Sequence, residues 1–169
     1  GNLFVAEFIG APKMNIIRTQ LLKENGKYYV TPFGAKIEVD GVNGELLKEK
    51  GVKPVLATNP LFPAMATHSR IRWAGLEPED FELVTTYENS SRCKPNPQYF
   101  QDVMDVLNIT SEECIMVGND TLEDMAAAKL GIPVFFLTHS LINKNHVDIE
   151  NYPHGDFSDL LDFIRGLNP

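Results

Sequence analysis

After residue 43, short apolar runs alternate with segments of helical pattern, and this alternation constrains the fold more than any other feature of the sequence. Four runs predict strands: Val52–Ala57, Phe81–Thr85, Cys114–Val117 and Val134–Leu137. The predicted helices are Gly44–Lys50, Ala64–Ala74, Gln98–Leu107, Asp124–Leu130 and Phe157–Leu167, the last of them amphipathic. Strands that alternate with helices in this order form βαβ units, so we predict an α/β fold with a parallel sheet.

The first 42 residues have a different pattern. Lys13–Lys23 predicts a helix. Tyr28–Val30 and Ile37–Val39 predict the two strands of a β-hairpin, with its turn at the segment PFG. We therefore divide the chain into an N-terminal segment, residues 1–42, that carries a helix and a β-hairpin, and an α/β core, residues 43–169.

The composition restricts the class of protein and its partners. The 169 residues, 43% of them hydrophobic, are enough for one globular domain with an ordinary core. The net charge of −8 argues against a nucleic acid or an anionic membrane as partner, because both require clusters of Lys and Arg. Two cysteines are too few for a disulfide framework, and no apolar run approaches the ~18 residues of a membrane span. With no secretory signal visible, we expect a soluble, cytoplasmic protein.

Polar residues follow the first predicted strand of the core, at Thr58 and Asn59. One interpretation is that they cap the helix that comes next. The other is an anion site, in which the Thr58 hydroxyl donates to an anionic oxygen with help from backbone N–H groups. The sequence leaves both interpretations open.

Lys94 lies between a polar loop and a predicted helix, and Pro95 and Pro97 follow it closely. An arbitrary lysine is most often a solvated surface residue. The two prolines restrict the local backbone, however, and a cation on a stiff loop is better suited to anchoring a phosphate than a cation on a flexible one. Lys94 is therefore a candidate phosphate ligand.

Asn119, Asp120 and Asp124 follow the predicted strand Cys114–Val117. A structural interpretation is that Asn119 or Asp120 caps the next helix, while Asp124 lies in its first turn. A functional interpretation is a Mg²⁺ site, because neighbouring carboxylates raise each other's pKa unless a cation neutralises them. All three strand ends of a parallel sheet face the same crevice, and a hydroxyl, a fixed cation and a metal site suit phosphoryl transfer.

The segments ATNP, CKPNPQYF and MVGNDTLEDM, in this order, resemble the second, third and fourth motifs of the haloacid dehalogenase-type (HAD) hydrolase superfamily. The resemblance extends over residues 43–165. It implies a Rossmann-like, doubly wound parallel sheet flanked by helices. It also implies a Mg²⁺-dependent phosphatase that hydrolyses small phosphorylated metabolites through an aspartyl-phosphate intermediate. By position, the phosphoryl group would bind at Thr58, Asn59 and Lys94, and the Mg²⁺ site would include Asn119, Asp120 and Asp124.

The first motif of that superfamily, an Asp-x-Asp-Gly that supplies the nucleophile and the general acid, is not found in the chain. The nearest string, KIEVDGVNG, would place Glu38 and Asp40 in these two roles. Its strand is short for a central parallel strand, and a glutamate is one methylene longer than the aspartate it would replace. We expect instead that the N-terminal portion of the family fold, with its central strand, is missing from this chain.

A missing central strand leaves two possibilities open. An incomplete sheet exposes strand edges and favours pairing with a partner chain, such as a second copy in a homo-oligomer. If the nucleophile is missing from the protein as well, the chain is a non-catalytic relative, a domain that binds phosphate or Mg²⁺ or another protein. An acidic nucleophile within reach of Thr58, Lys94 and Asp120 would distinguish the phosphatase from this relative.

Overall fold

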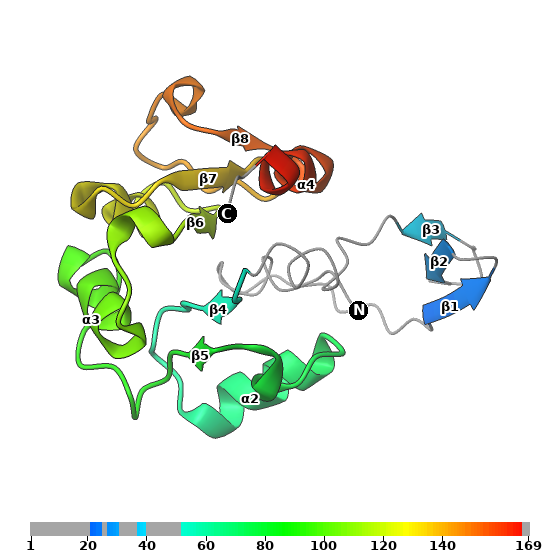
Figure 1. Ribbon diagram of the computed structural model, residues 1–169, viewed down its shortest axis with the longest axis horizontal. Helices are drawn as coiled ribbons and strands as arrows, with labels where there is room; N and C mark the ends of the chain where they lie inside the picture. Colours follow the sequence, from blue (N-terminus) through cyan, green and yellow to red (C-terminus); the bar gives the residue numbers. More distant parts are fainter. Residues whose placement is uncertain (1–20, 25–26, 31–36, 40–51, 167–169) are drawn as a thin grey trace.

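The computed structural model describes residues 21–24, 27–30, 37–39 and 52–166, which are shown in Figure 1. Within these ranges the parallel strands are β4 (Val55–Leu56), β5 (Leu83–Val84), β6 (Met116–Gly118), β7 (Val134–Leu137) and β8 (His154–Gly155). The α-helices are α2 (Ala64–Trp73), α3 (Pro97–Leu107) and α4 (Phe157–Gly166). Short 3-10 helices are η3 (Pro78–Asp80), η4 (Ser111–Glu113), η5 (Met125–Leu130) and η6 (Ile149–Asn151). The predicted α/β class is confirmed.

The parallel strands form two ladders rather than the single sheet that the alternation predicts. β4 pairs with β5, and β6, β7 and β8 pair in that order. In register, Leu56 lies beside Val84, and Val117 lies beside Phe135. Among the described strands none joins β4 to β6. Side chains that follow β4 contact the larger part of the core: Ala57 packs against the cluster that contains Val134, and Asn59 donates to Glu123. Asn59 and Glu123 belong to the candidate site.

β7 lies at the centre of the larger ladder and is covered on both faces. All four of its residues are buried. Val134 and Phe136 pack with residues of α3 and η5, whereas Phe135 and Leu137 pack against α4. A strand covered on both faces has a continuous apolar sequence, and burying each large side chain contributes about 1.5–3 kcal/mol. The prediction of Val134–Leu137 as a strand is therefore confirmed residue for residue.

The smaller ladder has its own apolar cluster. Leu56 of β4 and Val84 of β5 pack against Ile71 of α2, which lies alongside these strands in Figure 1. α2 ends at Trp73, one residue before its predicted end, and Gly75 follows with a φ of 80°, a left-handed conformation that glycine adopts without strain. No helix within the described ranges is long and apolar enough to cross a membrane.

α3 begins and ends with side chains suited to those positions. Asn96 is the N-cap, and its side chain accepts a hydrogen bond from the backbone N–H of Gln98 at 3.0 Å. Pro97 takes the first helical position, where a missing N–H has no cost. At the other end Asn108 adopts a left-handed φ of 53°. These residues fix the register of α3 and therefore the position of Tyr99 on it.

Several core elements differ from their prediction. β4 and β5 are each only two residues long, shorter than the predicted Val52–Ala57 and Phe81–Thr85. The predicted α-helix Asp124–Leu130 is the 3-10 helix η5. β8 was not predicted, because His154 and Gly155 form no apolar run. The predicted helix Gly44–Lys50 lies outside the described residues.

The N-terminal strands form a separate antiparallel sheet of β1 (Leu21–Glu24), β2 (Lys27–Val30) and β3 (Ile37–Val39). The predicted pairing of the two hairpin strands is confirmed, with Tyr28 opposite Val39, and the predicted turn at PFG lies outside the described residues. The predicted helix Lys13–Lys23 is wrong at its last three residues, which pair with β2 as a strand. Pairing with an adjacent strand outweighs the weak helix preference of so short a segment. The remainder of that predicted helix lies outside the described residues.

Candidate active site

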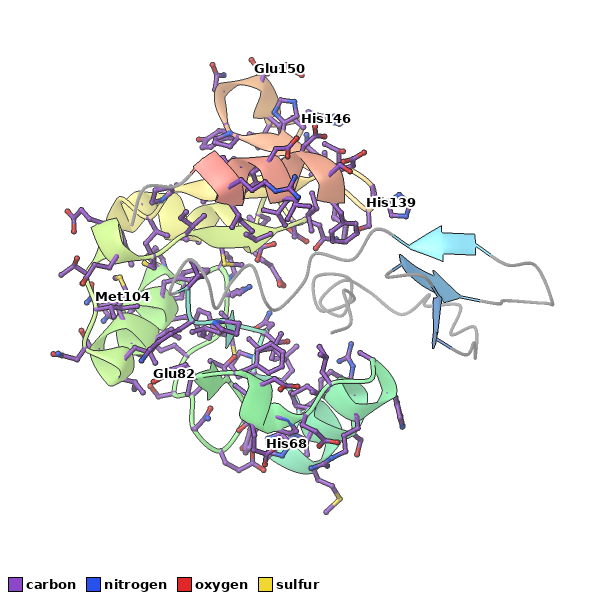
Figure 2. The ribbon with its side chains drawn as sticks, turned by 45° about the vertical axis from the view of Figure 1, so that its right-hand side comes forward. His68, Glu82, Met104, His139, His146 and Glu150 are labelled. Atoms are coloured by element: carbon purple, nitrogen blue, oxygen red, sulfur yellow. The ribbon has the colours of Figure 1, made fainter. Side chains whose placement is uncertain are left out.

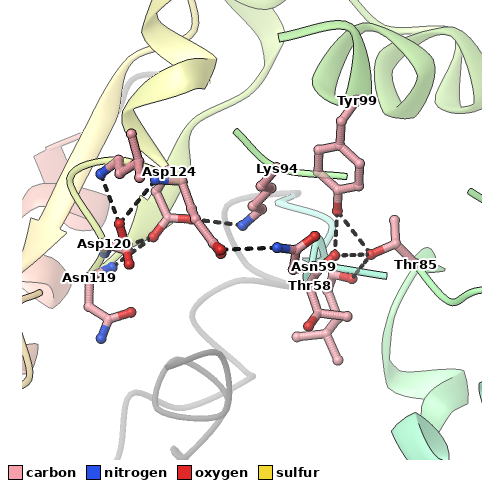
Figure 3. A network of polar contacts seen from close by, with 11 residues as sticks. Thr58, Asn59, Thr85, Lys94, Tyr99, Asn119, Asp120 and Asp124 are labelled. Carbon is pink, nitrogen blue, oxygen red and sulfur yellow. Dashed lines mark hydrogen bonds and ion pairs between the residues drawn. The ribbon is translucent and has the colours of Figure 1, made fainter. Parts of the chain in front are cut away.

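The C-terminal end of β4 and the loop after β6 come together in a polar network, shown in Figure 3. Asn59, which follows β4, donates from Nδ2 to Oε1 of Glu123 at 3.0 Å. Lys94, from the loop that precedes α3, donates to Asp124 of the same acidic loop. The strand ends singled out in the sequence thus contribute to one network, as parallel strands require.

Lys94 and Asp124 form a buried ion pair. Lys94 Nζ lies 2.7 Å from Asp124 Oδ1, and the two side chains are 0% and 3% exposed. The second carboxylate oxygen, Oδ2, accepts the backbone N–H groups of Asn119 and Asp120, both at 3.0 Å. A buried carboxylate with three donors is held in one orientation, and it holds the lysine in turn. The structure places Asp124 at the N-cap of η5, directly before the first turn in which the structural interpretation put it, and its side chain binds Lys94 rather than capping the helix.

Gly118 and two aromatic rings complete the surroundings of this ion pair. A Cβ atom on Gly118 would overlap the Asp124 carboxylate, so only glycine leaves room for it. Lys94 Nζ lies 5.6 Å from the ring centre of Phe100 and 6.0 Å from that of Tyr99. Both distances are within the range of cation–π attraction. The lysine is thus fixed by a carboxylate and by the rings of α3.

Asp120 and Asn119 have different partners from Asp124. Asp120 Oδ1 accepts the backbone N–H groups of Leu122 at 2.8 Å and of Glu123 at 3.0 Å, and so closes the turn that precedes η5. The interpretation that Asn119 or Asp120 caps the helix itself is wrong, because the N-cap of η5 is Asp124. Asn119 is buried and donates from Nδ2 to the carbonyl oxygen of Ser140 at 2.8 Å. That bond leaves the Oδ1 atom of Asn119 as an acceptor.

These oxygen atoms have the chemistry that Mg²⁺ requires. Mg²⁺ is usually bound by one or two carboxylates together with water and phosphate oxygens. The Asp120 carboxylate and Asn119 Oδ1 are hard oxygen donors and fit this description. Asp124 fits it less well, because both of its oxygens already accept hydrogen bonds. In the described part of the chain, no three His, Cys, Asp or Glu side chains are grouped so that they could bind a metal ion.

Thr58 is held through its backbone carbonyl group. The carbonyl oxygen accepts hydrogen bonds from the hydroxyl groups of Tyr99 and Thr85, each at 2.8 Å. The interpretation of Thr58 and Asn59 as a helix cap is wrong, because the N-cap of α2 is Pro63 and the first N–H of the helix, that of Ala64, donates to Glu88 at 2.8 Å. The role of Thr58 and Asn59 in binding an anion remains a prediction.

The surroundings of Glu123 and Tyr99 shift the pKa values of their side chains. Burial raises the pKa of the Glu123 carboxyl group, against the hydrogen bond from Asn59, which lowers the pKa. The charge of the neighbouring Asp120 raises the pKa further. Burial also raises the pKa of the Tyr99 hydroxyl group well above its ordinary value, so this group stays protonated and can donate.

The sequence did not single out several residues that the structure places in the network. Tyr99 and Thr85 resemble ordinary core residues in sequence, and only their partner Thr58 distinguishes them. Glu123 lies in sequence between Asp120 and Asp124, which were singled out, and this position could have identified it as a site residue. Ser140 comes from a polar connection with no readable pattern, and its contact with Asn119 depends on the tertiary fold.

The histidines are distributed over separate elements. Figure 2 shows His68 on α2, and His139 and His146 on the connection that leads from β7 toward β8. His154, in β8, lies 3.7 Å from Glu150. The four histidines therefore form neither a site of their own nor a part of the network around Lys94.

The weak nucleophile candidates stay predictions. Glu38 lies in β3, opposite Tyr29 of β2 in the antiparallel sheet. In the resembled superfamily the nucleophile follows a central strand of the parallel sheet. The antiparallel pairing of β3 does not match that position. Asp40 lies outside the described residues.

Known proteins resemble this chain in sequence. A family model described as haloacid dehalogenase-like hydrolase matches residues 37–131, which is more than half of the chain. The pyrophosphatase PpaX of Halalkalibacterium halodurans is 23% identical over 120 residues, which represent 70% of this chain and 54% of that protein.

Solved structures share the fold. One is described as a predicted phosphoglycolate phosphatase from Haemophilus somnus 129pt, with a TM-score of 0.59, 22% identity, and coverage of 71% of this chain and 53% of that chain. Another is a HAD phosphatase from Thermococcus onnurineus, with a TM-score of 0.59, 21% identity, and coverage of 78% of this chain and 59% of that chain. The chain thus spans a little over half the length of each of these relatives.

Proposed function

The chain belongs to the haloacid dehalogenase-like hydrolase family, and from this premise we propose that the protein is a Mg²⁺-dependent phosphatase of small phosphorylated metabolites. In the proposed reaction, a carboxylate oxygen of an aspartate attacks phosphorus, and the P–O bond to the alcohol breaks as a general acid gives its proton to the leaving alcohol oxygen. Water then attacks the resulting aspartyl phosphate and releases inorganic phosphate. The attacking aspartate is not assigned to a residue of this chain.

The buried ion pair of Lys94 is the observation that carries this proposal. Burying a lysine costs several kcal/mol unless its charge is compensated, and here Asp124 compensates it. A fixed ammonium group beside the end of β4 can stabilise the charge on phosphoryl oxygens without reorganising during the reaction. A lysine that served only solubility would lie exposed, as Lys53 does with 72% of its side chain accessible.

Thr58 and Asn59 supply neutral donors beside this cation. The Thr58 hydroxyl and the backbone N–H groups that follow β4 are suited to donate to phosphoryl oxygens. Asn59 is kept in place by its hydrogen bond to Glu123. Positioning and charge stabilisation of this kind provide most of the catalysis in phosphoryl transfer.

Asn119 and Asp120 are the residues that would bind Mg²⁺, while Asp124 orients Lys94 and the backbone of the loop. When bound, Mg²⁺ supplies further positive charge for the phosphate oxygens. Asp120 also closes the turn that carries Glu123, so one residue connects the proposed metal site to the bond with Asn59.

The test is the hydrolysis of para-nitrophenyl phosphate by the full-length protein, titrated with Mg²⁺. We expect activity that requires Mg²⁺ and that falls about 100-fold or more in Lys94→Met and in Thr58→Ala, because each variant removes a donor to the transferring group. Lys53→Met is the matched control, since it removes an exposed lysine whose partner, Glu82, is not one of the network residues.

Turnover that is unchanged in Lys94→Met and Thr58→Ala would contradict the proposed function. A protein that binds inorganic phosphate through Lys94 but turns over no phosphate ester would instead be the non-catalytic relative. Circular dichroism of each variant establishes that a loss of activity does not reflect a loss of folding.

A further inference from the structure

The backbone at Thr58 is not held by the strand ladder. β4 ends at Leu56, and the backbone N–H of Thr85 donates to the Leu56 carbonyl oxygen at 3.1 Å, next to the end of the ladder. The Thr58 carbonyl group lies beyond this point. Its orientation must therefore be set by contacts other than strand pairing.

Two buried hydroxyl groups provide those contacts (Figure 3). The Thr58 carbonyl oxygen, Thr85 Oγ1 and the Tyr99 hydroxyl oxygen form a triangle with sides of 2.8, 2.8 and 2.9 Å. Tyr99 is 1% exposed and Thr85 is 2% exposed, so water has little access to replace either group. Each hydroxyl group has one proton, and the carbonyl oxygen can accept from both.

The peptide group that contains this carbonyl joins Thr58 to Asn59. When the carbonyl oxygen is fixed, the plane of the peptide is fixed, and with it the direction of the Asn59 N–H. The same constraint limits the position of the Thr58 side chain. The Asn59 N–H and the Thr58 hydroxyl are among the groups proposed to donate to the phosphoryl oxygens.

Tyr99 also lies beside the other proposed phosphate ligand. Its ring centre is 6.0 Å from Lys94 Nζ, and its hydroxyl group reaches Thr58. One side chain on α3 therefore contacts the surroundings of both residues. This double contact distinguishes Tyr99 from an ordinary core tyrosine.

We propose that Tyr99 and Thr85 are positioning residues, which orient the Thr58–Asn59 peptide so that its donors are aligned on the phosphoryl group. The proposal rests on the proposed phosphatase function. Tyr99 is the principal residue of the pair, because it also packs beside Lys94. Neither residue is expected to touch the substrate.

Tyr99→Phe keeps the ring and removes the hydroxyl group, and steady-state hydrolysis of para-nitrophenyl phosphate measures the effect. We expect kcat to fall about tenfold while KM changes less than about twofold, because misalignment costs most in the transition state. Thr85→Val should lower kcat about threefold, since Tyr99 still donates, and Thr85→Ser should restore it. Tyr152→Phe is the matched control: its ring meets Phe136 edge-on at 5.6 Å, as Tyr99 meets Phe100 at 5.0 Å.

A double-mutant cycle separates positioning from a general loss of stability. If Tyr99 aligns both donors of this peptide, Tyr99→Phe should lower kcat by less in the Thr58→Ala background than the roughly tenfold fall expected in wild type, because Thr58→Ala has already removed one of the two donors. An equal loss in both backgrounds, or an unchanged kcat in Tyr99→Phe, would overturn the positioning role. If wild type shows no turnover, or if Thr58→Ala has full activity, the proposed function itself fails and the positioning role fails with it.

Discussion

At the scale of single residues, Asp124 connects the stability of the protein to its candidate site. It accepts hydrogen bonds from Lys94 and from the backbone of Asn119 and Asp120. Replacing it with Asn keeps the shape of the side chain and removes its charge. The ammonium group of Lys94 would then be buried without a compensating charge.

We expect Asp124→Asn to lower the free energy of unfolding by about 3–5 kcal/mol, measured by urea denaturation. Asp102→Asn is the control, since Asp102 pairs with Arg92 at 2.6 Å but both side chains are substantially exposed. That variant should cost less than about 1 kcal/mol. Equal costs in the two variants would show that Lys94 does not depend on Asp124.

Glu123 gives the protein a pH dependence with a definite sign. Burial raises its pKa in the folded state, so between the unfolded and the folded pKa the folded state binds more protons. The resulting loss of stability is absent below the unfolded value of about 4.3 and is complete above the folded pKa. Glu123→Gln retains an acceptor for Asn59 and cannot ionise. We expect it to raise Tm by about 1 °C at pH 7 and to have no effect below about pH 4.

Glu88→Gln is the control for this prediction, because the pKa of Glu88 is lowered in the folded state. Its Tm is measured by thermal denaturation in the same way. Hydrogen bonds lower the pKa of Glu88, first from its own backbone and then from Thr86, so its charged form is favoured in the folded state. This variant should not raise Tm at pH 7. A higher Tm for Glu88→Gln, or a lower one for Glu123→Gln, would contradict the assignment of these two environments.

At the scale of elements, the start of α3 determines where Tyr99 lies. Asn96 caps the helix through Gln98 N–H, and Tyr99 follows directly. We expect Asn96→Ala to lower the free energy of unfolding by about 1 kcal/mol and to lower kcat as the first turn frays. Asn96→Asp retains the acceptor and should stay close to wild type in both measurements. If Asn96→Ala leaves stability unchanged, the cap does not fix the first turn.

Elements that follow from local sequence were predicted well, whereas those that depend on partners were not. Val134–Leu137 is apolar throughout because both faces of β7 are covered, and this pattern is visible in one segment. β8 has only His154 and Gly155, and its position comes from pairing with β7. Leu21–Glu24 was predicted partly as a helix because its strand character depends on β2. Local sequence does not contain these partners.

At the scale of the whole molecule, the sequence predicted which residues gather at the site but not how they pair. Thr58, Lys94 and Asp124 were identified because polar groups follow buried strands of a parallel fold. That Asp124 binds Lys94 across 30 residues of sequence could not be inferred from spacing. The structure thus adds a buried ion pair with Lys94, while the predicted role of Asp124 in binding Mg²⁺ stays a prediction.

The two ladders should differ in their resistance to opening. β7 is covered on both faces, whereas β4 and β5 have a smaller cluster around Leu56. We expect the amide of Phe136 to exchange with solvent at least about tenfold more slowly than that of Thr85 in native-state hydrogen exchange. Equal rates at these two amides would mean that the ladders open as one unit.

The bond between Asn59 and Glu123 has a consequence for the order of folding. It joins residues 64 positions apart, about twice the 30 positions between Lys94 and Asp124. Each doubling of a closed loop costs about 0.6 kcal/mol more chain entropy, so the longer closure is the less favourable of the two. In refolding, phosphate-ester turnover should therefore recover only after the pair of Lys94 and Asp124 has formed. Enzymatic activity would then report the completion of folding, and a chain arrested before that closure would be compact but inactive.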